Sequence, residues 1–485
     1  MEKNTRSSRK ISEKKRWFAA HVGRFTLAAL LVSAVVFVAL PDLMRAGIAS
    51  QLNYRTASFS AGASPTAAKI GDLDGDGLND IAVVNIQGNL QLFFNNGAGS
   101  FNRVSINGLW SSSSNTLDVD IGDLNRDGRN DIAVAFSTQR GAVSVLFNQG
   151  NRTFTAPVNY DLCNSSKGVA IGDLDQDGDN DLADISQCSR SGILVNNGHG
   201  GFTLNGTYGS GTASRSIGLG DFNRDGFKDI AYINGNVNGS VTVVLNNRNA
   251  TFGSPSLYYA GDLPDALTVG DFDGDGADDV AIANSYYSQV IFLLGDGHGS
   301  FYSYSELTAG DTPTGIASAD FNGDGLLDVA VTSFVTNTLT IAINRGNYNF
   351  DRPVSFSVGQ SPIDIEAGKL DGDSLPDLVS VNQSSGSITV LFSAVGTPPT
   401  TPPTTPPATI TVSTRKTNLA RFVDLRWSGA TAQSLEIYRN GSRIATVSNN
   451  GSYTDQMNRR ATGTFRYKVC VAGSQTCSNE ASVSF

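Results

Sequence analysis

Histidine is scarce in this 485-residue chain, which limits the chemistry that the protein can perform. The three histidines are His21, near the N-terminus, and His199 and His298, which sit in NGHG and DGHG turns. No nucleophile stands near a base, and nearly all the acids belong to repeated loops, so we assign no catalytic residue. A carboxylate pair acting on a polysaccharide is the enzymatic alternative, although no pair stands apart from the repeats.

Charged residues make up only 16% of the chain, and nucleic acid is excluded as an expected partner. The net charge is −10, and because residues 1–24 carry +6, the rest of the chain carries −16. An acidic surface repels the phosphate backbone. The 52 glycines and the short runs of Val, Ile, Phe, Tyr and Thr between Asn-Gly and Asp-Gly turns predict an all-β protein instead.

Long apolar runs are absent except for one, FTLAALLVSAVVFVAL at 25–40, which follows the basic residues 1–24. This pattern predicts either a signal sequence, cleaved after Ala49, or a membrane anchor. Basic residues ahead of the run keep residues 1–24 in the cytoplasm, so both alternatives place the chain after about residue 50 outside. A secreted or cell-surface protein is therefore expected, in contact with membrane only through this segment if it is not cleaved.

The four cysteines show no zinc-ligand spacing, and their number suits an oxidising compartment. The natural local pairs for disulfides are Cys163 with Cys188 and Cys470 with Cys477.

A nine-residue string returns seven times, and this repeat predicts the fold. Successive copies begin 51, 50, 48, 50, 49 and 49 residues apart, each within the same series of four apolar segments. The copies, loops 1 to 7 below, are DLDGDGLND from Asp72, DLNRDGRND from Asp123, DLDQDGDND from Asp173, DFNRDGFKD from Asp221, DFDGDGADD from Asp271, DFNGDGLLD from Asp320 and KLDGDSLPD from Lys369.

Each repeat predicts four antiparallel strands, the size of one β-propeller blade, and seven blades close into a ring. A linear solenoid would use shorter units and capping repeats. The seventh unit stops at 388–396 without its fourth strand, whereas FSAGASP at 59–65 matches FSVGQSP at 356–362. We therefore expect residues near 54–61 to complete the last blade and leave no free edge.

The acids of each loop alternate as DxDxDGxxD, which is typical of a calcium cage. Side chains at positions 1, 3, 5 and 9 converge if the backbone curls tightly, and glycine at position 6 permits the left-handed conformation. Position 7 varies so widely that only its carbonyl can serve, whereas position 9 is always Asp. The predicted ligands of loops 1 to 6 are Asp72, Asp74, Asp76, Leu78, Asp80, Asp123, Asn125, Asp127, Arg129, Asp131, Asp173, Asp175, Asp177, Asp179, Asp181, Asp221, Asn223, Asp225, Phe227, Asp229, Asp271, Asp273, Asp275, Ala277, Asp279, Asp320, Asn322, Asp324, Leu326 and Asp328.

The loops differ in charge, and six of the seven are expected to bind calcium. Loops 1, 3 and 5 carry four carboxylates and should bind more tightly than loops 2, 4 and 6, which have Asn at position 3. Loop 7 has Lys369 and Ser374 at positions 1 and 6, so we expect no metal there, with the lysine standing in for the ion. Plain hairpin turns are the alternative. An EF-hand is excluded because position 12 is never Glu.

The loops, the Gly-Asp before them and turns such as NNGAGSF at 95–101 resemble FG-GAP/VCBS repeats, which form the integrin α-subunit propeller and occur in many bacterial surface proteins. The resemblance covers residues from about 54 to 396. It implies a calcium-stabilised propeller used for adhesion or ligand binding, with ligands at positions 1, 3, 5, 7 and 9. It leaves the partner open, because the same fold accompanies enzymes and sensors.

Successive connections in a blade alternate between the two faces of the ring. The nine-residue loops and the NNG turns therefore share one face, called the loop face below. The opposite face receives the remaining connections and, with them, the candidate ligand-binding aromatics Trp110, Tyr286, Tyr287 and Phe334, together with Cys163 and Cys188. These rings suit stacking on a sugar or insertion into a partner; the alternative is that each packs over its own blade.

A proline-rich spacer at 397–408 separates the propeller, at 50–396, from a second domain at 409–485. About seven short strands there predict an immunoglobulin-like sandwich. It resembles a fibronectin type III domain, with Trp427 and Tyr467 as core residues; the pair Cys470 and Cys477 departs from most of that family.

The chain is thus expected to be a monomeric, calcium-binding surface or secreted module that binds an extracellular protein or glycan. A secreted carbohydrate-active enzyme and a purely structural spacer are the alternatives.

Overall fold

The computed structural model describes most of the chain from residue 52 onward. The described ranges are 52–97, 99–107, 115–137, 142–162, 166–186, 191–208, 214–235, 239–393, 409–416, 420–428, 434–440, 442–448, 451–458, 462–471 and 478–485. The N-terminal segment, the proline-rich spacer, Trp110, Cys163, Cys188 and Cys477 lie outside them. Among the described residues, no helix has the length and apolar character needed to cross a membrane. The chain divides into two compact units, Met1–Val395 and Gly396–Phe485.

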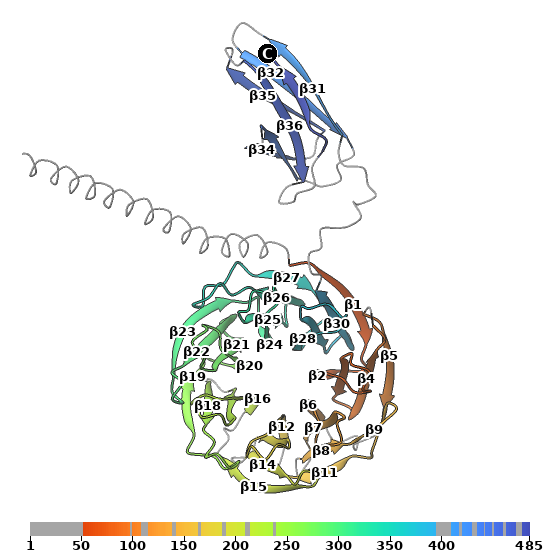
Figure 1. Cartoon of the computed structure of the whole chain (residues 1–485), viewed down its shortest axis with the longest axis vertical. Helices are drawn as coiled ribbons and strands as arrows, with labels where there is room; N and C mark the ends of the chain where they lie inside the picture. The colour runs from red at the N-terminus through yellow and green to blue at the C-terminus, as the bar shows by residue number, and fades with distance from the viewer. Residues whose placement is uncertain are drawn as a thin grey trace, which may run out of the picture. The chain divides into compact units, whose positions relative to one another are not determined.

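The first unit contains seven four-stranded antiparallel sheets (Figure 1). Each sheet is one blade, contains one of the loops and takes the number of that loop. Blade 1 is β2 (Pro65–Gly71), β3 (Asp80–Asn85), β4 (Asn89–Asn95) and β5 (Phe101–Ile106); blade 2 is β6 (Asn115–Gly122), β7 (Asp131–Ser137), β8 (Ala142–Leu146) and β11 (Val158–Asp161), with a small hairpin of β9 (Asn148–Gly150) and β10 (Thr153–Phe154); blade 3 is β12 (Ser166–Gly172), β13 (Asp181–Ser186), β14 (Ser191–Asn196) and β15 (Phe202–Tyr208); blade 4 is β16 (Ser214–Gly220), β17 (Asp229–Asn234), β18 (Ser240–Val244) and β19 (Ser256–Tyr259).

The remaining blades repeat the pattern, and the last one takes its fourth strand from the start of the described chain. Blade 5 is β20 (Pro264–Gly270), β21 (Asp279–Asn284), β22 (Gln289–Gly295) and β23 (Phe301–Thr308); blade 6 is β24 (Pro313–Ala319), β25 (Asp328–Ser333), β26 (Thr338–Ala342) and β27 (Val354–Ser357); blade 7 is β28 (Pro362–Gly368), β29 (Asp377–Asn382), β30 (Ser387–Ser393) and β1 (Tyr54–Ser60).

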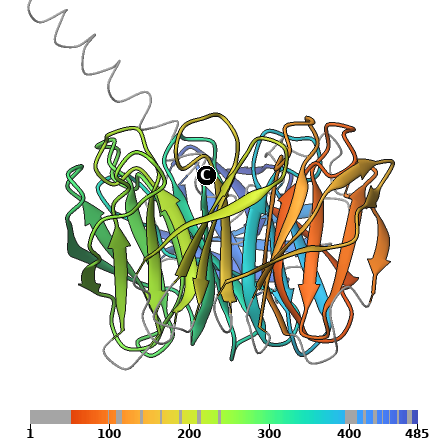
Figure 2. The same ribbon diagram turned by 90° about the horizontal axis from the view of Figure 1, so that it is seen from below.

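The blades form a closed ring, the arrangement of a β-propeller. The first strands contact one another in the order β2, β6, β12, β16, β20, β24, β28 and back to β2, and the strands run along the ring axis (Figure 2). The second strand of each blade is buried along all or nearly all of its length, as in β3 and β13, because neighbouring sheets cover both of its faces. Such strands read as continuous apolar runs, which explains segments such as IAVV.

The hydrophobic core of the ring is divided among the seven junctions between neighbouring blades. At the junction of blades 1 and 2, Leu92 and Phe94 pack with Ile132 and Val134. The junction of blades 7 and 1 is filled in the same way, so the point where the chain closes is as apolar as the others.

Strand β1 closes the ring by pairing with β30, with Tyr54 opposite Ser393 and Ser60 opposite Ser387. This pairing confirms the prediction that residues near 54–61 complete the last blade.

The second unit has seven strands in two sheets with one shared core. One sheet has the order β31 (Thr409–Lys416), β32 (Ala420–Ser428), β35 (Ser452–Asn458), and the other β34 (Ser442–Ser448), β33 (Ser434–Arg439), β36 (Thr464–Val471), β37 (Ala481–Ser484). Trp427 and Tyr467 are buried in the core, as predicted. Cys470 is disulfide-bonded, and its partner lies outside the described residues.

Removing β1 should open the ring. A chain that begins at Gly62 leaves the edge of β30 unpaired, so we expect its melting temperature to fall by more than about 4 °C and its aggregation to increase. A chain that begins at Leu52 keeps β1 and is the control. Scanning calorimetry of the two chains tests the closure, which equal melting temperatures would contradict.

Candidate metal centres

The seven loops connect the first and second strands of their blades and lie side by side on the loop face. In loops 1 to 3 the asparagine at position 8 contacts the neighbouring loop: Asn79 Nδ2 donates to the carbonyl of Lys369 at 3.1 Å, and Asn130 Nδ2 to that of Asp72 at 2.9 Å. Each candidate metal site therefore has a second site as its neighbour.

In every loop the carboxylate at position 9 accepts hydrogen bonds from two separate parts of its blade, an arrangement called the clasp below. In loop 1 the two oxygens of Asp80 accept hydrogen bonds from the backbone N–H groups of Leu73 and Asn95, both at 2.8 Å. The same pair of bonds, between 2.6 and 3.0 Å, is made by Asp131, Asp181, Asp229, Asp279, Asp328 and Asp377.

This clasp changes the interpretation of position 9. Its invariance was expected to reflect metal coordination, but Asp377 makes the same bonds in loop 7, which lacks the first Asp and the glycine. The clasp alone thus explains why position 9 does not vary. Burial raises the pKa of these carboxyl groups, to about 6 for Asp80 and about 8 for Asp328.

The loop backbone is held by position 1. In loops 1 to 6 the first Asp accepts a bond of 2.7–3.1 Å from the N–H of the glycine at position 6, which is left-handed as predicted. Position 4 is left-handed too, which the sequence analysis missed. Loops 2, 3 and 4 place Arg126, Gln176 and Arg224 there, and each side chain donates to a backbone carbonyl of the next loop.

Carboxylates converge in loops 1, 3 and 5, the three loops with Asp at position 3. In each, one oxygen from positions 1, 3 and 9 lies within 4.8 Å of the others; the groups are Asp72, Asp74, Asp80; Asp173, Asp175, Asp181; and Asp271, Asp273, Asp279. The carboxylates of position 5, predicted to converge as well, are not members of these groups. Instead, Asp76 Oδ1 accepts a bond from Leu78 N at 2.9 Å, which closes the local turn.

Loops 3 and 5 each contain a fifth aspartate, which stands at position 7 in loop 3 and at position 8 in loop 5. Asp173 Oδ1 and Asp179 Oδ1 are buried and have no hydrogen-bond donor among the described residues. Burying a carboxylate oxygen without a donor is costly, and a divalent cation held by Asp173, Asp175 and Asp181 would offset this cost for Asp173. The donor set of loop 3 therefore fits a hard cation such as Ca²⁺. Position 7 was expected to offer only a carbonyl, but here it also carries a buried carboxylate, which is not a member of the converging group.

Arginines already compensate part of the charge in other loops. Arg152 from blade 2 pairs with Asp74 of loop 1 at 2.6 Å, and Arg224 from loop 4 pairs with Asp275 of loop 5 at 2.8 Å. In loop 3 the nearest such contact is longer, 3.9 Å from Arg126 to Asp177. The three acidic loops are therefore not equivalent, as the charge count alone had suggested.

Loop 7 is held in a different way from the one expected. Lys369 is exposed, and within the described residues it makes no ion pair with Asp371, Asp373 or Asp377. The hydroxyl of Ser393 instead donates to Asp373 at 3.2 Å. Lys369 thus does not replace the charge of the ion, and the hydroxyl of Ser393 holds the loop instead. Ser374, at position 6, does not adopt the left-handed conformation that a metal cage requires.

The first asparagine of the NNG turns ties neighbouring blades together. Asn95 Nδ2 donates to the carbonyl of Leu370 in blade 7, and Asn148 Nδ2 to that of Leu73 in blade 1, at 2.7 and 2.8 Å. Asn196, Asn246 and Asn344 make the equivalent bonds. In the sequence these turns are only a repeated motif; their role depends on contacts with residues 72 to 275 positions away, which no local pattern reveals.

A family model described as an FG-GAP-like repeat matches the chain six times, at residues 72–134, 125–183, 173–232, 221–282, 271–331 and 320–380. Each match runs from one loop through the next. The chain belongs to the FG-GAP-like repeat family. Among curated proteins, no sequence match was found.

BBS1N, a solved structure of low sequence identity, shares the fold of the FG-GAP-like repeats. BBS1N, from a crystal structure of its complex with ARL6DN, is 13% identical, with a TM-score of 0.51 over 71% of this chain and 98% of the other. The extracellular domain of BT3049 from B. thetaiotaomicron is 12% identical, with a TM-score of 0.48 over 87% and 55% of the two chains.

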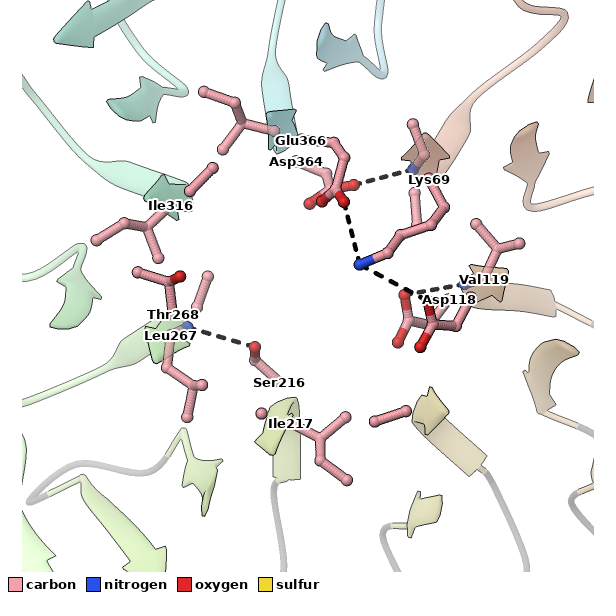
Figure 3. A pocket seen from close by; sticks show the side chains of 18 of the residues that line it. Lys69, Asp118, Val119, Ser216, Ile217, Leu267, Thr268, Ile316, Asp364 and Glu366 are labelled. Atoms are coloured by element: carbon pink, nitrogen blue, oxygen red, sulfur yellow. Dashed lines mark hydrogen bonds and ion pairs between the residues drawn. The ribbon is translucent and has the colours of Figure 1, made fainter. Parts of the chain in front are cut away.

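A cavity of about 480 Å³ runs through the centre of the FG-GAP-like repeats, lined by the first strands. Lys69 points into it and pairs with Glu366 at 3.1 Å and Asp120 at 3.6 Å (Figure 3). Asp364 accepts a bond from the backbone N–H of Ala68, and Asp118 from that of Val169, both at 3.0 Å. These carboxylates hold neighbouring inner strands together, so we assign them a structural role.

On the opposite face, Tyr286 and Tyr287 lie in the connection between β21 and β22, and Phe334 in that between β25 and β26. All three are exposed.

Replacing the clasp of loop 7 should destabilise the propeller without involving metal. In Asp377→Asn, one amide oxygen replaces two carboxylate acceptors, so one buried N–H group loses its partner. The free energy of unfolding should fall by about 1–3 kcal/mol. We expect the same fall in urea midpoint with calcium and with chelator. A fall seen only in calcium would show that loop 7 binds the ion.

The buried carboxylates of the central cavity predict that the stability of the propeller depends on pH. Burial raises the pKa of Asp364 to about 7, so the folded protein holds its proton more tightly than the unfolded chain does, and stability falls as pH rises from about 4 to 7. Asp364→Asn keeps an acceptor for Ala68 and should reduce this slope in chelator by the share of one carboxyl group, whereas Asp364→Ala should lower the melting temperature at every pH. An unchanged slope in Asp364→Asn would contradict the assignment.

Proposed function

We propose that this FG-GAP-like repeat protein is an exported, calcium-stabilised β-propeller that binds an extracellular ligand on the face opposite its metal loops. The observation that supports metal binding comes from loop 3, where two buried carboxylate oxygens have no hydrogen-bond donor among the described residues. Calcium suits these sites because it accepts six to eight oxygen ligands in flexible geometry. When bound, the ion supplies positive charge that lets several carboxylates approach one another.

The loops that support this proposal are 1 to 6, with loop 3 as the strongest site. Asp173, Asp175 and Asp181 converge there, and Asp179 adds a buried carboxylate. Loop 1 should bind calcium less tightly than loop 3, because Arg152 already forms an ion pair with Asp74. Loops 2, 4 and 6 replace one carboxylate with Asn and are weaker. The role of the ion is to stiffen a face whose loops already contact one another.

Export and ligand binding rest on the sequence: the N-terminal pattern, the cysteine content and the aromatic side chains of the opposite face. The second unit supports the same architecture, because its two sheets with Trp427 and Tyr467 in a shared core fit a fibronectin type III-like spacer or binding domain. Within the described residues, His199 and His298 lie in exposed turns of the loop face, which favours a binding role over catalysis.

Calcium titration of the full chain after chelator treatment tests the metal. With dissociation constants of about 10⁻⁴–10⁻³ M, 2 mM calcium should stabilise the fold by about 0.6–1.8 kcal/mol for each site. Calorimetry should give about six sites, and Asp175→Ala, at position 3 of loop 3, should remove the tightest. Asp371→Ala in loop 7 is the matched control and should leave the stoichiometry unchanged. A melting temperature that is the same in calcium and in chelator would refute the proposal.

A further inference from the structure

Three exposed tyrosines gather on the opposite face at the junction of blades 4 and 5. Tyr286 and Tyr287 form the tip between β21 and β22, and Tyr259 ends β19. Their side chains are 63%, 45% and 59% exposed, respectively, whereas Tyr208 and Tyr232 of the neighbouring junction are buried. Packing over their own blade therefore does not account for these three rings.

The tyrosine tip is rigidly held. The hydroxyl of Ser285 donates to the carbonyl of Leu263 at 2.9 Å, and Tyr287 N donates to Asn284 Oδ1 at 3.0 Å. Asn284 is itself buried and donates to the carbonyl of Ala260 at 2.8 Å. The rings of Tyr286 and Tyr287 meet edge to face, with centroids 5.0 Å apart. A surface fixed before binding loses little conformational freedom when a ligand arrives.

Polar groups surround the rings. The hydroxyl of Tyr287 donates to Asp262 Oδ2 at 3.3 Å. The neighbouring Tyr259 and then the charge of Asp262 raise the pKa of Tyr287 to about 12. Aromatic faces bordered by hydroxyl and carboxylate groups match a pyranose, which has C–H groups on its faces and hydroxyls around its rim.

The platform continues onto blade 6. Ser288, beside Tyr287, accepts a bond from Thr312 N at 3.5 Å, and the carbonyl of Thr312 accepts one from Phe334 N at 3.0 Å. Phe334 and Val335 are exposed at this second tip. A row of apolar contacts along two connected tips suits an extended chain of sugars. The acids beside it, Asp262 and Asp311, and the net charge of −10 disfavour an anionic one.

We propose that Tyr259, Tyr286, Tyr287 and Asp262, extended by Phe334, form a binding platform for an uncharged polysaccharide. This inference rests on the proposed ligand-binding function and specifies its ligand class and site. The rings stack against sugar faces, and the carboxylate of Asp262 accepts hydrogen bonds from sugar hydroxyls.

Affinity electrophoresis of the full chain in gels containing hydroxyethyl cellulose, mannan or laminarin tests the platform, with alginate as the anionic comparison. We expect retardation by at least one neutral polysaccharide and none by alginate. The double variant Tyr286→Ala, Tyr287→Ala should bind at least about 10-fold more weakly, as expected when central aromatic contacts are removed. The double variant with Phe at both positions keeps the rings and should bind within about 3-fold of the parent chain.

Tyr302→Ala is the matched control, because Tyr302 is 55% exposed but begins β23 at the loop face. Its binding should equal that of the parent chain, and all variants should share one melting temperature. Retardation by alginate alone, by gelatin alone or by no polymer would overturn the proposal, as would equal weakening by Tyr302→Ala. A calcium-dependent melting temperature in a chain that binds no neutral polysaccharide would refute the platform and leave the metal proposal intact.

Discussion

The clasp made by the aspartate at position 9 is the interaction on which the blades depend. The carboxylate of Asp80, at the start of β3, accepts hydrogen bonds from the N–H groups of Leu73, just after β2, and of Asn95, at the end of β4. One buried side chain therefore connects the first three strands of the blade. Asn95 then carries this connection to the neighbouring blade. The clasp recurs in all seven blades and the asparagine bond in five of them, so hydrogen bonds tie most neighbouring blades together on the loop face, where the metal sites lie.

The metal loops are therefore an addition to a frame that is complete without them. Loop 7 shows this frame with a serine hydroxyl in place of the cage, whereas loop 3 shows it with carboxylates that have no donor among the described residues. Between these extremes, arginines such as Arg152 take up part of the negative charge. The repeats thus share one backbone and differ in electrostatics, which lets each site be tuned without changing the fold.

The repeat spacing predicts the blades, the closing strand and the position of the loops, because these follow from periodic patterns. The parts that it missed depend on contacts between distant residues. The Asn148 bond to blade 1 and the hydrogen bond from Ser393 have no local signature. The left-handed Arg126 would not be expected at position 4, since its conformation is offset by a bond to the next loop. An invariant aspartate looked like a ligand because a structural clasp and a cage select the same residue.

Strand β1 also determines how the ring responds to force. Tyr54 and Ser393 lie opposite each other at one end of the β1–β30 ladder, so the chain enters and leaves the propeller at adjacent points. Tension applied between the N-terminal segment and the C-terminal unit would load these hydrogen bonds one at a time, from Tyr54 toward Ser60. A ladder pulled in this direction unzips at low force, whereas a sheared ladder resists with all its bonds together. Opposed pulling through both ends would therefore open the propeller at its closing blade first.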